Sequence, residues 1–256
     1  MTIFADAVET DRLRLHRLTA EEIAPLDLYE HCSAPEMERV TRYLPWDPHG
    51  TPRETAVFLD EMTEAWAAGD HAAYAIRPRE GQAGAGEFAG ACGIDLDWET
   101  RRGHLGIWLR ERFQCRGYAG ERAAALLAVA FERLDLDLVV VETLVGNEAS
   151  RTAIERYVDA HGGRYEGRLR GERRAGGEVQ DVHRYTVSQS EWADSEADVA
   201  VRFPRRPDSV RPSSTCRCRS LVKYVEFTVR SVDGESRGPR CRRGRRRLRF
   251  RLPPDV

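Results

Sequence analysis

The feature of this sequence that most restricts its fold is a strand–loop–helix–strand–helix order across the middle of the chain. The run RGHLGIWLR (102–110) alternates leucine and isoleucine with other residues and predicts a strand. After the loop QCRGYAG, alanine and leucine recur at helical spacing over about 118–134 and predict an amphipathic helix. The β-branched run at 136–145 predicts a strand buried on both faces, and 147–163 predicts a second helix that ends at glycines. This order implies a sheet covered by helices.

The flanking segments add strands and two helical regions to this core. Thr51, Pro52 and Gly69 are typical of the start and the end of a helix. The other expected elements are a strand at 10–18, a helical segment near 20–34, strands at 71–79 and 88–98 joined by the turn 81–87, and two strands within 164–188. The order as a whole predicts an α+β fold, in which a mixed α/β sheet is flanked by helices.

The loop ahead of the central helix has the composition of an anion-binding site. A helix N-terminus presents free backbone N–H groups and a partial positive charge, which attract phosphate. Gly117, followed by small residues at 119 and 120, lets a bulky anion approach the backbone, and Arg116 adds a full charge. For the loop taken alone, the alternative is a glycine needed only to turn the chain.

Charge divides the chain into two unlike parts. Residues 1–199 carry 23 arginines, no lysine and 37 acidic residues, whereas the rest of the chain carries 17 basic and five acidic residues. After Trp192 the sequence is rich in Arg, Pro and Ser and lacks usable periodicity, apart from one isolated candidate strand at 221–232. We therefore expect a folded domain over 1–192 and a disordered basic tail over 193–256.

Composition favours a cytoplasmic protein without a metal site. No apolar run reaches the ~18–20 residues of a membrane span, and the N-terminus lacks a signal-peptide pattern. The six cysteines form no CxxC pair, which argues against zinc, and disulfides are not expected without secretion signals. The acidic excess over 1–199 indicates a salt-adapted, halophilic host, while GC-rich coding is the alternative explanation for the single lysine, Lys223.

Together these segments resemble the GCN5-related N-acetyltransferase (GNAT) family, and within it the RimJ/RimL type that acetylates ribosomal-protein N-termini. The runs HLGIWLRERFQCRGYAGERAAALLAVAFERL and VVVETLVGNEASRTAIERYV carry this resemblance, which covers about residues 8–190. The family's loop, Gln/Arg-x-x-Gly-x-Gly/Ala, is matched in full by 114–119, and Asn147 and Ser150 match an Asn-x-x-Ser common in this branch. The resemblance implies a mostly antiparallel sheet with a splayed parallel pair, and acetyl-CoA as co-substrate.

The resemblance also assigns the contacts with acetyl-CoA. Backbone amides of the loop would hold the pyrophosphate, and the strand at 102–110 would pair with the pantetheine arm where the parallel strands splay apart. Asn147 and Ser150, which follow the strand at 136–145, would flank the arm near the acetyl end. The implicated residues are Ile107, Trp108, Leu109, Gln114, Cys115, Arg116, Gly117, Tyr118, Ala119, Gly120, Asn147 and Ser150.

The catalytic residues of the family are matched less completely. Relatives often carry a glutamate base two residues before the strand glycine, where this chain has His104, which is either the base or a strand histidine with no role. The family's tyrosine acid falls at Ile154, and Tyr157, one turn later, is a substitute whose alternative role is core packing. Residues 35–70 and 164–185 are expected to select the acceptor. The candidates there are Trp46, Asp47 and Trp66, the last of which also fits the core stripe of its helix.

Other functions stay open at this point. The acceptor is either a protein N-terminus or a small molecule, and the enzyme is either a monomer or a homodimer. Because the family's tyrosine is missing, the domain could instead bind CoA without catalysis, as a sensor or scaffold. The arginine-rich run at 240–251 could dock the protein on ribosomal RNA or a ribosomal protein. Translation out of frame, or past a lost stop codon, is the alternative origin of this tail.

Overall fold

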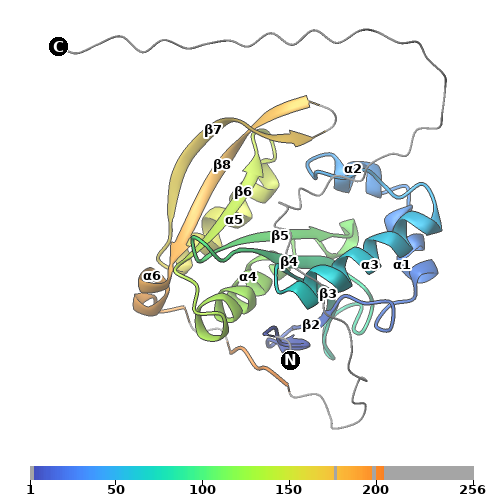
Figure 1. Ribbon diagram of the computed structural model, residues 1–256, viewed down its shortest axis with the longest axis horizontal. Coiled ribbons are helices and arrows are strands. Elements are labelled where there is room, and N and C mark those ends of the chain that lie inside the picture. The colour runs from blue at the N-terminus through green and yellow to red at the C-terminus, as the bar shows by residue number, and fades with distance from the viewer. Residues whose placement is uncertain (1–2, 176–177, 198–199, 205–256) are drawn as a thin grey trace, which may run out of the picture.

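The computed structural model describes residues 3–175, 178–197 and 200–204, which form one eight-stranded sheet with flanking helices (Figure 1). The strand order is β1-β2-β3-β4-β5-β6-β8-β7, and only β5 and β6 pair in parallel. The predicted α+β class and mostly antiparallel sheet are confirmed. The strands are β1 (Ala7–Glu9), β2 (Leu13–Arg17), β3 (His71–Pro78), β4 (Gly90–Asp97), β5 (Arg102–Leu109), β6 (Leu138–Leu144), β7 (Arg164–Ala175) and β8 (Glu178–Ser188).

Helices cover both faces of the sheet. Helices α1 (Pro25–Cys32) and α3 (Pro52–Ala68) pack through Leu28 and Leu59 on one face, in a cluster that includes alanines of β3 and β4. Helices α4 and α5 cover the other face, over a larger core cluster. No helix of the described residues is long and apolar enough to cross a membrane. The remaining helical elements are α2 (Met37–Thr41), η1 (Glu111–Phe113, 3-10), α4 (Tyr118–Ala128), η2 (Val129–Arg133, π), α5 (Glu148–Ala160) and α6 (Gln189–Asp194).

The predicted ends of α3 are confirmed by its capping geometry. The Thr51 side chain accepts a hydrogen bond from the backbone N–H of Glu54, and Pro52 is the first helical residue. At the other end, Gly69 has a φ of 83°, the left-handed conformation that ends a helix at little cost for glycine. These signals are local, so the sequence is sufficient to place them.

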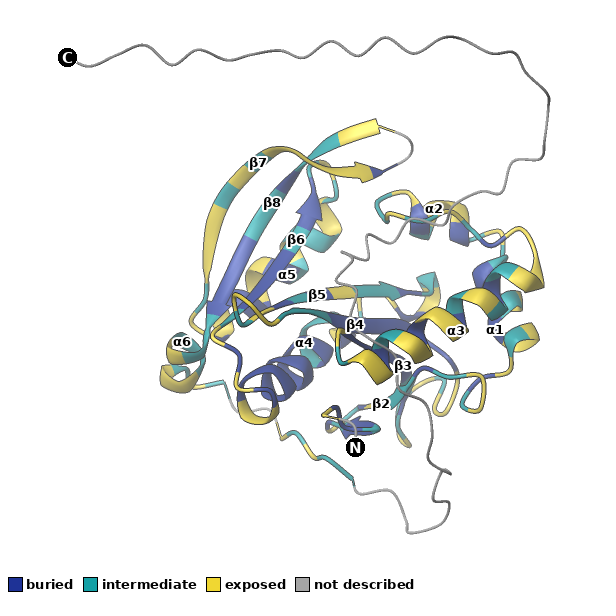
Figure 2. Cartoon of the chain, in the orientation of Figure 1, coloured by how far each residue is buried: buried dark blue, intermediate teal, exposed yellow. Residues whose placement is uncertain are grey.

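Helix α4 is among the most buried parts of the chain, dark blue along most of its length in Figure 2. The helix predicted over 118–134 is α4 followed by the π-helical turn η2, in which the N–H of Leu134 donates to the carbonyl of Val129 at 3.1 Å. Since α4 is held against the sheet along its length, its N-terminus has a fixed position next to β5.

Part of the chain beyond residue 192, residues 200–204, lies against the edge strand β1. Arg202 and Glu9 of β1 exchange two backbone hydrogen bonds of 2.8 Å, and Val201 and Phe203 pack against the core. Arg133 lies over the Phe203 ring, 5.1 Å from its centroid. The candidate strand at 221–232 and the arginine-rich run lie outside the described residues.

Candidate functional site

The predicted site lies where β5 and β6 separate. Their parallel register runs from Arg102↔Leu138 to Leu105↔Val141 and then ends, although β5 continues to Leu109. Figure 1 shows the two strands diverging beyond this paired segment. Because β5 stays paired with β4 along its whole length, only its edge toward β6 loses its strand partner. The amides of an extended ligand can satisfy the backbone groups of such an edge.

A tight loop carries the chain from β5 to α4. The side-chain Nε2 of Gln114 donates to the backbone oxygen of Leu109 at 2.9 Å and so ties the loop to the end of the strand. Cys115 (φ 58°) and Gly117 (φ 79°) both have left-handed backbone, which is uncommon for a residue other than glycine. Alternation of left- and right-handed residues gathers N–H groups into a concave nest that binds anions.

The N-terminus of α4 is left open by its own side chains. Gly117 is the N-cap residue, and no side chain caps the first turn. Tyr118 is buried in the core, whereas Ala119 and Gly120 are small and half-buried. The positive end of the helix dipole is therefore accessible to a phosphate group.

Two arginines hold the loop through hydrogen bonds. Arg12 donates from Nη1 to the backbone oxygen of Arg116 at 3.0 Å, and its Nε lies 2.6 Å from Oε2 of Glu121. Thr10 also donates to Glu121, at 2.6 Å, so the one carboxylate in the first turns of α4 is neutralised. The Arg116 side chain turns outward and donates to the carbonyl of Ala83 at 3.1 Å. Arg12, which the sequence analysis missed, is thus the second cation beside the loop.

The diverging part of β5 contains the three strand residues assigned to pantetheine. Leu109 is buried, whereas Ile107 and Trp108 are half-buried and point to opposite faces of the sheet. The Trp108 ring contacts the rings of Trp46 and Phe88, with centroids 5.7 and 5.6 Å away. These contacts fix the end of β5 against the α1–α3 side of the molecule.

Asn147 and Ser150 lie together at the start of α5. Asn147 is the N-cap residue, and its Oδ1 accepts a hydrogen bond from the backbone N–H of Ser150 at 3.2 Å. Both residues are half-buried just beyond the diverging end of β6. The Asn-x-x-Ser pattern therefore has a capping role here, whatever ligand contacts it also makes.

His104 lies on the sheet face opposite to α4 and α5. Its register partners are Asp95 and Val140, and burial lowers its pKa, with a smaller opposing effect from Glu142 on the same face. A Cβ built on Gly106, the next residue on this face, would meet no atom within 4 Å. This part of the sheet is therefore open, and the imidazole is neutral near pH 7.

Glu142 is a buried carboxylate beside His104 that the sequence analysis missed. Its oxygens accept from Nε of Arg173 at 2.9 Å and from Nε of Arg184 at 2.7 Å. Burial alone would raise its pKa, but the two guanidinium groups prevail and lower it. An acidic residue within the apolar run VVVETLV was the available sequence signal.

Tyr157 lies on the opposite face of the splayed strands from His104. It is 5% exposed, and its hydroxyl has no hydrogen-bond partner other than Arg122 among the described residues. A Cβ built on Gly120 of the loop would lie 3.7 Å from the Cβ of Tyr157. The structure thus brings Tyr157 next to the loop but not to His104.

The three acceptor candidates separate in the structure. Trp66 is 2% exposed and packs against Phe4 and Tyr74, so it belongs to the core. Trp46 is half-buried against Trp108, and Asp47 is exposed beside it. Trp46 and Asp47 therefore stay near the diverging end of β5.

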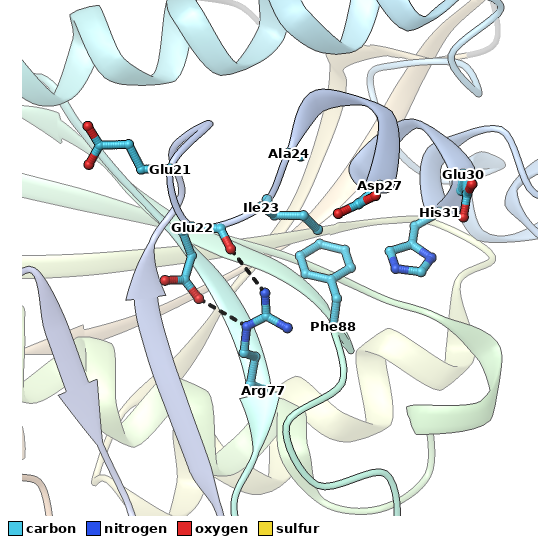
Figure 3. A pocket seen from close by; sticks show the side chains of 9 residues that line it. All are labelled: Glu21, Glu22, Ile23, Ala24, Asp27, Glu30, His31, Arg77 and Phe88. Carbon is cyan, nitrogen blue, oxygen red and sulfur yellow. Dashed lines mark hydrogen bonds and ion pairs between the residues drawn. The ribbon is translucent and has the colours of Figure 1, made fainter.

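A separate surface pocket lies between the β2–α1 loop, α1, the end of β3 and Phe88 in the β3–β4 loop (Figure 3). Arg77 donates there to a carboxylate oxygen of Glu22 at 3.0 Å and to its backbone oxygen at 3.3 Å. Four carboxylates line this pocket, so it repels phosphate and differs in charge from the loop before α4. They belong to Glu21, Glu22, Asp27 and Glu30.

The described residues contain no group of three or more His, Cys, Asp or Glu side chains arranged to hold a metal ion. Cys32 and Cys92 are buried free thiols, and Cys115 is an exposed one. Cys115 thus contributes its backbone conformation to the loop and has no disulfide partner there.

Comparison with known proteins agrees with this geometry. Residues 12–157, more than half of the chain, match the family model described as the acetyltransferase (GNAT) domain. Over 105 residues the chain is 31% identical to the "Putative ribosomal N-acetyltransferase YdaF" of Bacillus subtilis (strain 168). This match covers 40% of the chain and 55% of that relative, so the chain spans about half the length of the curated relative.

Solved structures share the fold. Mycobacterium smegmatis RimJ, in complex with CoA-disulfide, is 16% identical, with a TM-score of 0.64 over 76% of this chain and 92% of its own. RimL, a ribosomal L7/L12 alpha-N-protein acetyltransferase in complex with coenzyme A, is 21% identical, with a TM-score of 0.59 over 73% and 98%. A GCN5-related N-acetyltransferase from Brucella melitensis is 24% identical, with a TM-score of 0.62 over 74% and 81%.

Proposed function

This chain belongs to the GNAT acetyltransferase family, and we propose that it moves an acetyl group from acetyl-CoA directly to a primary amine in a ternary complex. The observation that carries the proposal is the uncapped N-terminus of α4, reached through a left-handed loop beside a splayed parallel strand pair. The N-terminus of α4 can bind phosphate, and the open edge of the strand pair can bind an extended chain of amides.

The co-substrate would occupy these two elements in sequence. N–H groups between Cys115 and Gly120 would hold the pyrophosphate, with Arg12 and Arg116 supplying positive charge. The pantetheine arm would then follow Ile107 to Leu109 along the open edge of β5. Asn147 and Ser150 would flank its acetyl end.

The transfer needs a neutral amine, a polarised carbonyl and a proton for the leaving sulfur. The amine nitrogen attacks the thioester carbon, the C–S bond breaks, and its electron pair leaves with sulfur. His104, neutral because its pKa is lowered, would accept the proton that the amine loses. A backbone N–H of β5 near Leu109 would bind the carbonyl oxygen, and positioning alone can supply about 7–11 kcal/mol.

For the acceptor, we propose a protein N-terminus of the ribosomal type or a small primary amine. The named relatives and the resemblance to the RimJ/RimL type support the first class. The open sheet face at Gly106, bordered by His104 and Trp108, would admit an amine from the side opposite to α4. The excess of acidic residues supports assay at high salt, as for a halophilic protein. The free cysteines fit a cytoplasmic location.

The test of this function is acetylation of a panel of amines and N-terminal peptides by acetyl-CoA in high KCl. Products are detected by mass, because the exposed Cys115 would react with thiol reagents. We expect turnover of at least one acceptor class. Stabilisation of the protein by acetyl-CoA without turnover of any amine would instead favour the sensor or scaffold role.

The loop itself is tested by Gly117→Glu. The substitution places a carboxylate where the pyrophosphate would bind, in a left-handed position that also strains the backbone. We expect the thermal stabilisation by acetyl-CoA to disappear. Gly81→Glu is the matched control, since Gly81 has a φ of 84° and free space around its Cβ position. Retention of acetyl-CoA binding in Gly117→Glu would contradict the assignment.

We also propose that the arginine-rich tail docks the enzyme on ribosomal RNA or protein, supported by its composition alone. A truncation after residue 204 keeps the backbone pairing of Arg202 with Glu9 and removes the arginine-rich run. Weaker RNA retention with unchanged acetylation of a short peptide is the expected result. Unchanged RNA retention would assign the tail no such role.

A further inference from the structure

Arg122 of α4 is a buried cation without an ionic partner. It is 1% exposed and is the largest fully buried side chain among the described residues. Its Nε and Nη1 have no hydrogen-bond acceptor in the described part of the chain, and no ion pair joins it to a carboxylate there. An uncompensated buried charge is strongly unfavourable, so its presence calls for an explanation.

The aromatic ring beside Arg122 is that of Tyr157. The guanidinium carbon lies 6.0 Å from the centroid of this ring, close enough for a cation–π contact. The Tyr157 hydroxyl is itself buried and has no hydrogen-bond partner other than this guanidinium. Burial raises the pKa of Tyr157 to about 12, against the lowering effects of the Arg122 charge and of a hydrogen bond from its guanidinium. A buried cation without a counter-ion and a buried phenol therefore lie next to each other in the free protein.

Both side chains belong to the face of the sheet that meets the proposed site. Side chains on a helix lean toward its N-terminus, so the Tyr157 ring covers the preceding turn of α5, which contains Ile154. Arg122 extends from α4 to this ring and to Cys92 of β4, whose pKa its charge lowers against the larger effect of burial. Thr143, on β6 just beyond the last parallel pair, is a further buried polar residue, and its Oγ1 has no partner among the described residues. These polar groups thus lie on the α4 and α5 face of the strands that separate.

We propose that Arg122 is a positioning residue that enables Tyr157 to protonate the leaving CoA sulfur. This inference rests on the proposed acetyl transfer. When the C–S bond breaks, sulfur takes the electron pair and the Tyr157 O–H proton, leaving a phenolate beside the guanidinium. The buried cation acquires its counter-ion at that step, and solvent restores the phenol after CoA leaves. The amine proton goes separately to His104, on the other face.

A purely structural role makes the opposite predictions. If Arg122 only packs, Arg122→Met removes contacts and lowers the melting temperature, and catalysis changes only as far as the fold does. If Arg122 waits for a counter-ion, methionine removes an unpaired charge at similar length. The free protein then melts at the same temperature as the wild type or higher, while kcat falls.

The experiment measures kcat, KM for acetyl-CoA and the melting temperature of Arg122→Met, Arg122→Lys, Tyr157→Phe and the double variant Arg122→Met/Tyr157→Phe. We expect Tyr157→Phe to lower kcat about 100-fold, within the usual range for loss of a general acid. Arg122→Met lowers kcat at least 10-fold with little change in KM, and lysine restores part of it. The double variant is no slower than Tyr157→Phe, because Arg122 acts through the phenol. Arg156→Met, an exposed arginine next to Tyr157 in sequence, is the control and keeps wild-type kcat.

Three results would overturn the inference: additive losses in the double variant, wild-type kcat in Tyr157→Phe, or a lowered melting temperature that accounts for the loss in Arg122→Met. A failure of the proposed function is distinguished from these, because the wild-type protein would then acetylate no amine.

Discussion

The two faces of the splayed strands differ in how their polar groups are satisfied. On the face of His104, Glu142 is bonded to Arg173 and Arg184, so its charge is compensated before any substrate binds. On the face of α4 and α5, the buried Arg122 has no counter-ion and contacts only the phenol of Tyr157, and Thr143 Oγ1 has no partner among the described residues. A compensated network holds a base in a fixed state, whereas uncompensated groups gain partners only when a ligand or a reaction step supplies them. In the proposed mechanism, the acceptor face, which bears His104 and would admit the acceptor, is thus compensated in the free protein, whereas the donor face, which bears Arg122, would gain its counter-ion only during turnover.

The largest expected effect is loss of the base on the compensated face. His104→Gln should lower kcat/KM about 100-fold, the scale of a general base, without altering binding of acetyl-CoA on the other face. Its measurement is steady-state kinetics with the best acceptor. His31→Gln is the control, since His31 also has a pKa lowered by burial but lies in the acidic pocket. Equal losses in both variants would remove His104 from the mechanism.

The second effect tests whether the network on the acceptor face stabilises the fold. Glu142→Ala leaves Arg173 and Arg184 without their carboxylate and should lower the free energy of unfolding by about 2 kcal/mol, reduced from the fully buried case because both arginines are partly exposed. The pKa of Glu142 is lowered by folding, so its contribution is present above its unfolded value of 4.5 and lost as pH falls below it.

Urea unfolding at pH 7 and below pH 4.5 checks both parts. The difference between variant and wild type should narrow in acid. Glu155→Ala is the control, because Glu155 pairs with Arg151 and accepts a hydrogen bond from Tyr185 on an exposed helix surface, where solvent screens the charges, and should contribute much less than Glu142. A similar loss in both variants would mean that the buried network has no special stability.

A smaller effect links the network to His104. Burial has the largest single effect and lowers the pKa of His104. Among the nearby charges, Glu142 has the largest effect and raises this pKa, whereas Arg173 and Arg184 each lower it by a smaller amount. Glu142→Gln removes the raising effect, so the acidic limb of the pH–rate profile should move to lower pH. The base must be neutral to act, so activity at acid pH would increase relative to the plateau. An acidic limb that moves to higher pH, or does not move, would show that another group controls the pH dependence.

Local sequence signals were sufficient for the parts of the site set by short-range geometry. Gly117 and Gln114 could be assigned because a loop before a helix is specified by a few adjacent residues, and Thr51 with Gly69 fixed α3 similarly. Arg12 and Glu121, 109 positions apart, meet only because β2 and α4 are neighbours in the fold. The partners of Glu142 depend on the register of β6, β7 and β8, which spacing along the chain does not reveal. Arg122 continues the buried stripe of Tyr118 one turn on, so its position, though not its lack of partners, was available from the sequence.

The smallest expected effect concerns Thr143, whose buried Oγ1 has no partner in the described residues. Thr143→Val removes this oxygen and keeps the shape of the side chain, so the free energy of unfolding should stay within about 0.5 kcal/mol of wild type. Thr55→Val is the control, because Thr55 is equally buried but bonds to Nδ1 of His49 at 2.7 Å, and its loss should cost about 1–3 kcal/mol. If the donor face is completed by its ligand, Thr143→Val should also reduce the thermal stabilisation by acetyl-CoA, since the ligand loses an acceptor or donor there. A destabilisation like that of Thr55→Val would show that the Thr143 hydroxyl already has a hydrogen-bond partner in the free protein. The difference between the two faces would then rest on Arg122 and Tyr157 alone.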